Sequence, residues 1–304
     1  MTTVTNGKKF NDAAGALKFT SLPVYGDVYF ANNADTNSAA AGGQSRSTPA
    51  ATLMQAQALC NAPTNLSAYG DFVYVGAGHA ENVTAAGMTF AIPGVTYIGQ
   101  GNGRLRPKLT WTATASQAVL SGQGVSFQNF VFDFTGIDAV VAAMSLQAAD
   151  VSMINCDLIC NTATAGVIRG IYANTSGSPA DRLLMSNCRI IGTQTNSGTT
   201  TTAAVDIEYG ASVQILDTQF SGKATQHVLN ATTCLDWFIG RNSFHTYTGT
   251  KSISLAAGTT GFGFRNSFAV ASGTAPIVGA GFTWSGNVYS TEALTIGTPT
   301  ATAF

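Results

Sequence analysis

The sequence predicts an all-β fold, a single-stranded parallel β-helix in which short strands wind into stacked coils. From Phe72 onward it shows short apolar runs separated by Gly, Asn, Ser and Thr, in place of a long helical pattern. A unit of alternating apolar residues also recurs through most of the chain, and this alternation is the period of a strand that buries one face. Both features are typical of a solenoid.

The recurring unit has two alternating apolar residues, then a polar or Gly position, then another apolar residue. Its spacing of roughly 20 to 32 residues fits coils with turns of unequal length, whereas a propeller needs about 40 to 50 residues per blade. About eight or nine coils at ~4.8 Å each predict a rod roughly 40 Å long. The copies occupy Gly94–Gly101, Gly124–Phe134, Asp150–Cys160, Arg182–Gly192, Ser212–Phe220, Asp236–Phe244, Gly261–Phe268 and Gly281–Tyr289.

The chain divides into an N-terminal arm (1–27), the β-helix (28–290) and a C-terminal tail (291–304) that we expect to cap the last coil or contact a partner. The arm has two interpretations of equal weight: it packs along its own body, or it reaches onto a neighbouring subunit. After a short strand at Val28–Phe30, a capping helix is expected at about 49–60, with Thr48 as the N-cap and Pro49 in the first position. Such a helix would lid the open end of the coils.

The polar position of the unit is often asparagine, which tolerates the left-handed bend between two strands. Its amide can hydrogen-bond the same amide one coil away, so we predict an inward, structural ladder. Cys156 and Cys188 follow two of these asparagines and are expected to stack as buried thiols rather than as a disulfide. The predicted ladder consists of Asn129, Asn155, Asn187, Asp217 and Asn266.

Charge is sparse: 10% of the 304 residues are charged, against about 25% in an average domain, and the formal net charge is −1. This balance argues against nucleic acid or an anionic membrane as partner. It also suggests that much of the surface is covered in an assembly. A bilayer-spanning run and a secretory signal are not apparent. Five scattered cysteines indicate neither a disulfide framework nor a zinc site, and we expect no metal and no cofactor.

The opening stretch resembles the N-terminal region of the pectin-lyase-like superfamily of right-handed parallel β-helix proteins. The likeness rests on a strand, a Gly/Ser-rich loop, Thr-Pro before a short helix, and Gly-Asp before a strand and a glycine turn. It covers the first third of the chain, and the repeats extend it to about Tyr289. The resemblance implies the fold but not the function, because the superfamily includes lyases, hydrolases, bacteriophage tailspikes and noncatalytic virion parts. The matching positions are Val28–Phe30, Ala40–Gly43, Thr48-Pro49, Gly70-Asp71, Val73–Val75 and Gly76–Gly78.

An enzyme acting on polysaccharides would need two carboxylates about 5 to 9.5 Å apart. Asp133 and Asp157 occupy nearly the same position of successive units, and Asp206 and Glu208 would face one side of a strand. Either pair could bind a sugar or a cation, although ordinary solvated carboxylates are the favoured interpretation. The signatures of pectin-degrading enzymes are incomplete here, since Gly78-His79 is followed by Ala80 and Arg189-Ile190 by Ile191. We therefore lean against an enzyme.

The favoured function is a structural virion protein of a bacteriophage, a capsid decoration or cement protein that staples neighbouring capsid subunits. Its partners would be capsid protein or other virion subunits, in a homotrimer assembled in the host cytoplasm and located in the virion. One alternative is a tailspike or adhesin that binds a glycan through Trp111, Trp237 or Trp284, although the last two match inward positions of the repeat. The other is a polysaccharide lyase or hydrolase.

Overall fold

The computed structural model describes most of the chain between residues 27 and 297. The described residues are 27–60, 70–84, 86–113, 116–137, 140–160, 168–174, 179–192, 201–222, 224–245, 251–270, 277–279, 281–291 and 296–297. The predicted N-terminal arm lies outside them except for Asp27, so both interpretations of the arm stay open.

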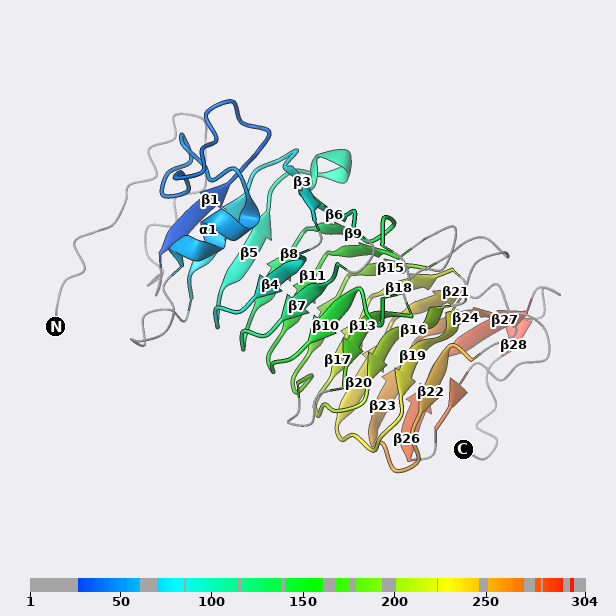
Figure 1. Cartoon of the computed structure of the whole chain (residues 1–304). Coiled ribbons are helices and arrows are strands. Elements are labelled where there is room, and N and C mark those ends of the chain that lie inside the picture. Colours follow the sequence, from blue (N-terminus) through cyan, green and yellow to red (C-terminus); the bar gives the residue numbers. More distant parts are fainter. Residues whose placement is uncertain are drawn as a thin grey trace, which may run out of the picture.

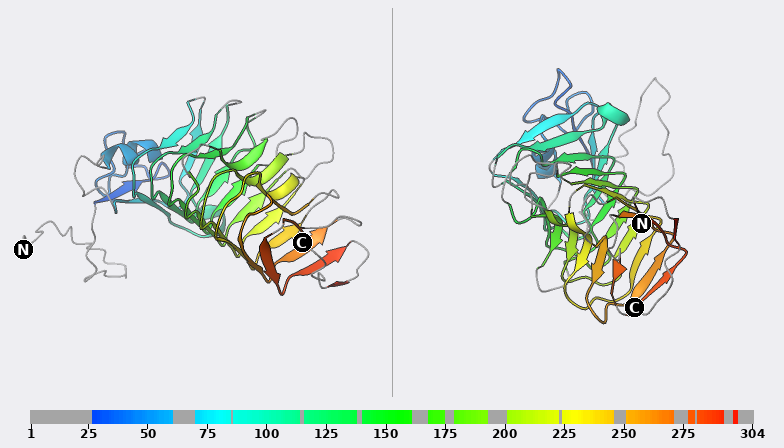
Figure 2. Two further views of the ribbon diagram at one scale, coloured as in Figure 1. Left: turned by 90° about the horizontal axis from the view of Figure 1, so that it is seen from below. Right: turned by 90° about the vertical axis from the view of Figure 1, so that its right-hand side faces the viewer.

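Three sheets wrap around one core and form a parallel β-solenoid with a short helix near its N-terminal end, as the sequence predicts (Figure 1). Figure 2 shows the stack elongated from one side and nearly end-on from the other. Consecutive strands of one sheet come from consecutive coils. The first sheet is ten-stranded: β1 (Val28–Ala31), β2 (Phe72–Val75), β5 (Thr96–Gly99), β8 (Ser126–Gln128), β11 (Ser152–Ile154), β14 (Leu184–Ser186), β17 (Gln214–Leu216), β20 (Trp237–Gly240), β23 (Gly261–Phe264) and β26 (Phe282–Ser285).

The second sheet also has ten strands and the third has eight. The second comprises β3 (Ala80–Val83), β6 (Lys108–Trp111), β9 (Val131–Asp133), β12 (Asp157–Ile159), β15 (Arg189–Ile191), β18 (Gln219–Ser221), β21 (Ser243–His245), β24 (Ser267–Val270), β27 (Val288–Thr291) and β28 (Ile296–Gly297). The third comprises β4 (Met88–Phe90), β7 (Ala118–Leu120), β10 (Met144–Leu146), β13 (Arg169–Ala173), β16 (Thr201–Ile207), β19 (Ala224–Asn230), β22 (Ile253–Leu255) and β25 (Ile277–Val278). All named pairs are parallel except β27–β28, through which the predicted tail adds an antiparallel strand.

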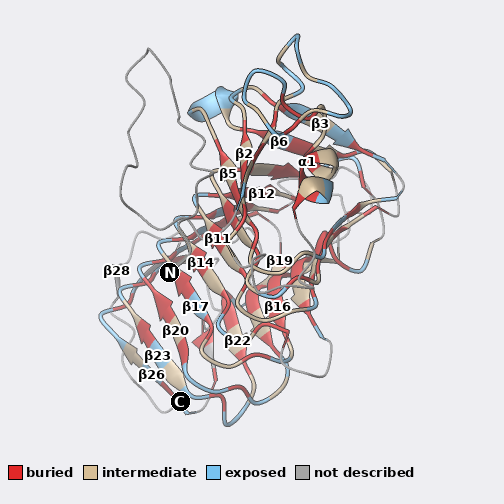
Figure 3. Ribbon diagram, turned by 90° about the vertical axis from the view of Figure 1, so that its left-hand side faces the viewer, coloured by how far each residue is buried: buried red, intermediate tan, exposed pale blue. Residues whose placement is uncertain are grey.

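Inward side chains form one continuous core, because in-register coils place like residues above one another. The rings of Phe220, Phe244 and Phe268 stack with centroid distances of 4.8 and 5.0 Å. Inward positions are close to fully buried, and outward ones are half-buried or exposed, which gives the alternation of red with tan or pale blue in Figure 3. This alternation is the sequence period that predicts the fold.

The capping helix α1 (Leu53–Leu59) starts later than predicted. Its N-cap is Thr52, whose hydroxyl accepts a hydrogen bond from Gln55 N–H in a capping box. Thr48 was the wrong cap because Ala50 exchanges backbone hydrogen bonds with the first strand, so this segment is held extended against β1. Leu53 and Ala56 are buried in the core cluster at this end.

Residues that follow the glycine turn at Gly76–Gly78 bond the segments around α1 to the first coils. His79 Nδ1 accepts a hydrogen bond from Asn33 N–H at 3.0 Å, so its Nε2 carries the proton and faces Glu81 at 3.1 Å. The Glu81 carboxylate also accepts a hydrogen bond from Leu53 N–H, at the start of α1. His79 and Glu81 therefore hold the capping segments in place.

Asparagines form two ladders rather than the single inward one predicted. Asn129, Asn155 and Asn187 occupy the left-handed bends after strands of the first sheet, with φ between 53° and 65°. The Asn187 amide donates to Asn155 at 3.1 Å, and the Asn155 amide donates to Asn129 at 2.8 Å. Because the bend points these side chains outward, Asn155 and Asn187 are exposed, and Asp217 takes the same outer position with φ 49°.

The inner ladder begins one residue further along. Asn242, Asn266 and Asn287 are 1%, 1% and 5% exposed, and their side chains are linked by hydrogen bonds of 3.0 Å. Asn266 belongs to this inner ladder and not to the outer one. In its coil Arg265 occupies the left-handed bend, with φ 49°, so Asn266 takes the inward position that follows. Cys156 and Cys188 take the equivalent inner positions of earlier coils as buried free thiols. Burial raises the pKa of Cys188 to about 11.

Among the described residues no helix is long and apolar enough to cross a membrane.

Substitution of the two ladders should separate their contributions to stability. Asn266→Ala leaves polar partners unsatisfied in the core and is expected to lower the free energy of unfolding by about 2 to 3 kcal/mol. Asn155→Gly keeps a residue suited to positive φ at an exposed bend and should cost less than about 1 kcal/mol. Urea unfolding followed by circular dichroism measures both, and equal losses would contradict the assignment of the inner ladder.

His227 should make stability depend on pH. It is 1% exposed beside Phe220 and Phe244, and burial lowers its pKa to about 4. The unfolded chain takes up this proton below about 6.5, so the stabilisation is complete above pH 6.5 and is lost as the pH falls towards 4. In His227→Phe the loss of unfolding free energy between pH 6.5 and pH 4 should be smaller by up to about 3 kcal/mol. In the exposed control His245→Phe this loss should be unchanged. Identical pH profiles for the two variants would disprove this role.

Candidate functional site

Asp157 is the centre of an ion-pair group on the second sheet. Arg106, which precedes β6, places Nη1 2.9 Å from the Asp157 carboxylate, and Arg189 on β15 places Nη2 at 2.7 Å. Arg106 also donates to the carbonyl oxygens of Phe130 and Asn155. The carboxylate is thus clamped between cations from an earlier and a later coil.

Asp133 lies on the neighbouring strand, two residues out of register with Asp157. Its carboxylate pairs with Lys108 Nζ at 2.6 Å and accepts hydrogen bonds from Thr135 at 2.6 and 3.0 Å. Burial raises the pKa of Asp133, but the bonds from Lys108 and Thr135 outweigh burial and hold the pKa below its usual value. Both aspartates of this pair are therefore bound to cations of their own.

Asp206 and Glu208 lie at the end of β16 on the third sheet, away from the first pair. The Asp206 carboxylate is 1% exposed and accepts a hydrogen bond from Arg169 Nε at 2.5 Å. Burial raises the pKa of Asp206, and Arg169 offsets this only in part. Glu208 accepts a hydrogen bond from the Tyr172 hydroxyl at 3.0 Å.

The Arg169 guanidinium stacks on the Tyr172 ring at 4.2 Å, so both carboxylates of this pair contact one cation–π pair from β13. One oxygen of Asp206, Oδ1, has no hydrogen-bond partner among the described residues. Burial of that oxygen keeps it from a polymeric substrate.

Two more ion pairs join the bends that flank the first sheet. Arg182 binds Asp150 through Nε and Nη2, and Arg241 binds Asp217 in the same two-pronged way. Apart from His79–Glu81, each ion pair found among the described residues joins one coil to another. The carboxylates predicted as catalytic candidates thus bond to side chains of other coils.

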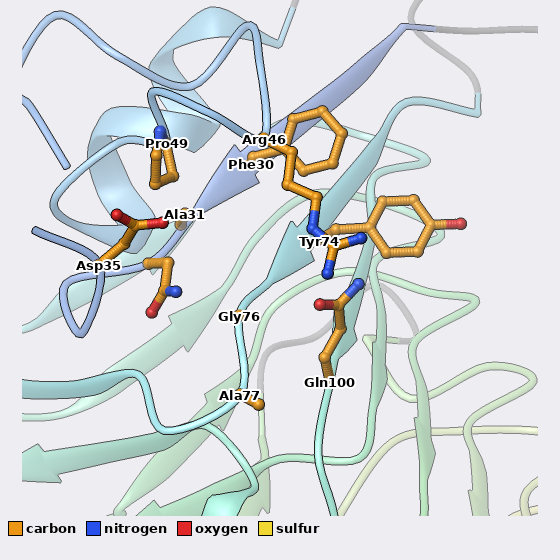
Figure 4. Close-up of a pocket in the computed structure, with 10 residues that line it drawn as sticks. Phe30, Ala31, Asp35, Arg46, Pro49, Tyr74, Gly76, Ala77 and Gln100 are labelled. Atoms are coloured by element: carbon orange, nitrogen blue, oxygen red, sulfur yellow. The ribbon is translucent and has the colours of Figure 1, made fainter. Parts of the chain in front are cut away.

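A shallow hollow of about 240 Å³ opens beside the loop between β1 and α1, which we call the capping loop (Figure 4). Phe30 and Tyr74 form one side, with ring centroids 6.1 Å apart and nearly parallel. The rest of the lining has polar side chains at Asn32, Asp35, Arg46 and Gln100, and it has small or apolar residues at Ala31, Pro49, Gly76 and Ala77. The sequence offered three tryptophans as glycan-binding candidates, whereas the aromatic residues of this hollow are Phe30 and Tyr74. The alternation of apolar residues in their strands also places both side chains outward.

The three tryptophans do not form such a surface. Trp111 and Trp237 are 0% and 1% exposed, and Trp237 Nε1 donates to the Gly210 carbonyl at 2.9 Å. Trp284 packs against the core from the last coil. Within the described ranges, no group of three or more His, Cys, Asp or Glu residues could hold a metal ion.

Comparison with known proteins adds little to this geometry. No family model and no curated protein matches the chain. Among solved structures, ORF18 of Geobacillus virus E2 is similar at 12% identity with a TM-score of 0.45. The match covers 78% of this chain, which spans 57% of the length of that protein. A likeness at this level carries no information about function.

The clamp around Asp157 should contribute more to stability than an exposed pair of the same charges. Asp157→Asn leaves two arginines without their anion, Arg106 being only 12% exposed, and should lower the free energy of unfolding by about 2 to 3 kcal/mol. The matched control Asp217→Asn, at a carboxylate 40% exposed, should cost less than about 1 kcal/mol. Denaturant unfolding measures both values, and a neutral Asp157→Asn would contradict the structural role.

Proposed function

We propose that the chain is a structural component of a bacteriophage particle, a capsid decoration or cement protein that staples neighbouring capsid subunits. The observation that carries the proposal is the use of its ionisable side chains between coils. Arg106, Asp157 and Arg189 join nearby coils that are far apart in the sequence, and the inner and outer ladders join successive coils along the rod. Such bonds make a stiff rod, which suits a contact protein.

Two sequence features support the same function. The opening motifs resemble a superfamily that contains noncatalytic virion parts. Charged residues make up only 10% of the chain, which fits a surface that is covered by neighbours. The long sides of the rod would then be the surfaces that meet capsid protein.

A glycan-binding spike is the second candidate, and the hollow beside the capping loop favours it. Aromatic rings stack on the apolar faces of sugars, and planar amide and guanidinium groups hydrogen-bond their hydroxyls. Tyr74, Arg46 and Gln100 supply these groups on neighbouring segments.

Imaging of purified particles that contain the chain tests the leading proposal. We expect rod-shaped density on the outside of the capsid that bridges adjacent subunits. Density for the chain that is confined to the tail would contradict a cement function.

Binding and turnover assays against a panel of bacterial polysaccharides test the alternatives. A spike predicts binding that falls at least tenfold in Tyr74→Ala and is kept in the outward control Val119→Ala. An enzyme predicts turnover that is lost in Asp133→Ala or Asp206→Ala. The structural proposal expects neither binding nor turnover.

A further inference from the structure

The outer side of the first sheet carries two rows of side chains that run the length of the rod. Each strand contributes one residue to each row, from Val28 to Thr283 in the first and from Phe30 to Ser285 in the second. We call this surface the outer face of the first sheet. Many of its residues are half-buried, and they appear as tan parts of strands of the first sheet in Figure 3.

The outer face is free of charge and rich in large apolar residues. More than half of its positions are apolar, among them Tyr74, Ile98, Ile154, Leu184, Phe238 and Phe262, and none is Asp, Glu, Lys or Arg. The outward positions of the second sheet, by contrast, include Lys108, Asp157 and Arg189. Aromatic enrichment without charge is the composition of an interface core.

Polar bends border the outer face on both sides. Asp150 and Arg182 lie in the bends before two strands, and Asn155, Asp217 and Arg241 lie in the bends after strands. An apolar patch with a polar rim marks an interaction surface.

The size of the face reaches the lower limit of a specific protein–protein interface. Ten strands at ~4.8 Å span about 43 Å, and strands of three to four residues are about 10 to 13 Å wide. The flat area is therefore roughly 500 Å² per partner, or about 1,000 Å² in total, which is the lower limit for a specific interface.

About a two-fold axis through the middle of the face, each strand would meet the strand that lies equally far from the other end. Counted inward, β2 carries Phe72 and Tyr74, and its counterpart β23 carries Phe262 and Phe264. β8 and β17, the fourth strands from the two ends of the sheet, each carry an outward glutamine. The two central strands, β11 and β14, each carry one serine and one aliphatic residue. The other two pairs differ. Val28 and Phe30 of β1 would meet Thr283 and Ser285 of β26. Thr96 and Ile98 of β5 would meet Phe238 and Gly240 of β20.

One pair of rim charges is complementary in a two-fold arrangement. A two-fold axis between β11 and β14, parallel to the strands, brings the bend before β11 opposite the bend before β14 of a second copy. These bends hold Asp150 and Arg182, which already pair within one chain. Opposite charges therefore meet at both places across the axis, which favours this register.

We propose that the outer face binds a second copy of this chain, sheet against sheet, with the two rods antiparallel about that axis. The meeting of Asp150 with Arg182 across the axis favours a two-fold pair over the trimer expected from sequence. The inference stands apart from the proposed function, because it needs only the face itself.

The mass of the full chain in solution tests the contact. Light scattering after size exclusion should give twice 31.3 kDa at micromolar concentration. Ile154→Lys and Phe262→Lys place charges in the contact and should each give monomers with unchanged circular dichroism. The control Val119→Lys, at a half-buried outward position of the third sheet, should stay dimeric. A monomeric parent chain, or dimers that survive both substitutions, would overturn the proposal.

Cross-linking tests the orientation. The axis places Ser126 opposite Gln214 of the second copy, whereas three strand spacings of about 14 Å separate them within one chain. A short bismaleimide should join Ser126→Cys chains to Gln214→Cys chains in a mixture, and neither variant to itself. The five native cysteines are buried and should react slowly. Cross-links within Ser126→Cys alone would show parallel rods, as in a trimer, and would overturn the two-fold arrangement.

Discussion

In-register stacking of parallel coils is the constraint on which this structure depends. Every strand must repeat the path of the strand one coil earlier, so each side chain meets its counterpart from the previous coil. Apolar counterparts make the core, as Phe220, Phe244 and Phe268 do. Polar counterparts must be able to bond to one another, as Asn242, Asn266 and Asn287 do. The same rule governs the outer ladder and the ion pairs.

Much of the fold could be predicted because its repeat is local. Alternation of apolar residues gave the strands, and the small helix followed from its flanking Thr and Pro. The N-cap was misplaced from Thr52 to Thr48 because the bonds that hold Ala50 extended come from β1, which is distant in sequence. The ladder was placed inward because the unit does not show which of two adjacent residues takes positive φ. Arg265 takes it rather than Asn266, and no residue preference favours arginine there.

The candidate acids were recognisable, but their bonding partners were not. Asp157 binds Arg106 and Arg189, residues 51 and 32 positions away, and coil lengths vary too much to align them from sequence. Asp133 and Asp157 do lie on adjacent strands, as their positions in the unit suggest, yet each is bound to its own cation. Carboxylates in such pairs stabilise a rod. The outward aromatic residues of the first sheet are also readable in the sequence, because the alternation that buries Val73 and Val75 turns Phe72 and Tyr74 outward.

Coil-to-coil bonding by charged side chains is thus the feature that links the stability of this rod to its proposed use as a contact protein. A double-mutant cycle on Arg106→Leu and Asp157→Leu measures that bonding directly. If the two side chains stabilise the rod together, the double variant should lose less unfolding free energy than the two single variants lose in sum. The difference, which is the coupling energy, should be at least about 1 kcal/mol. Losses that add without coupling would contradict the account.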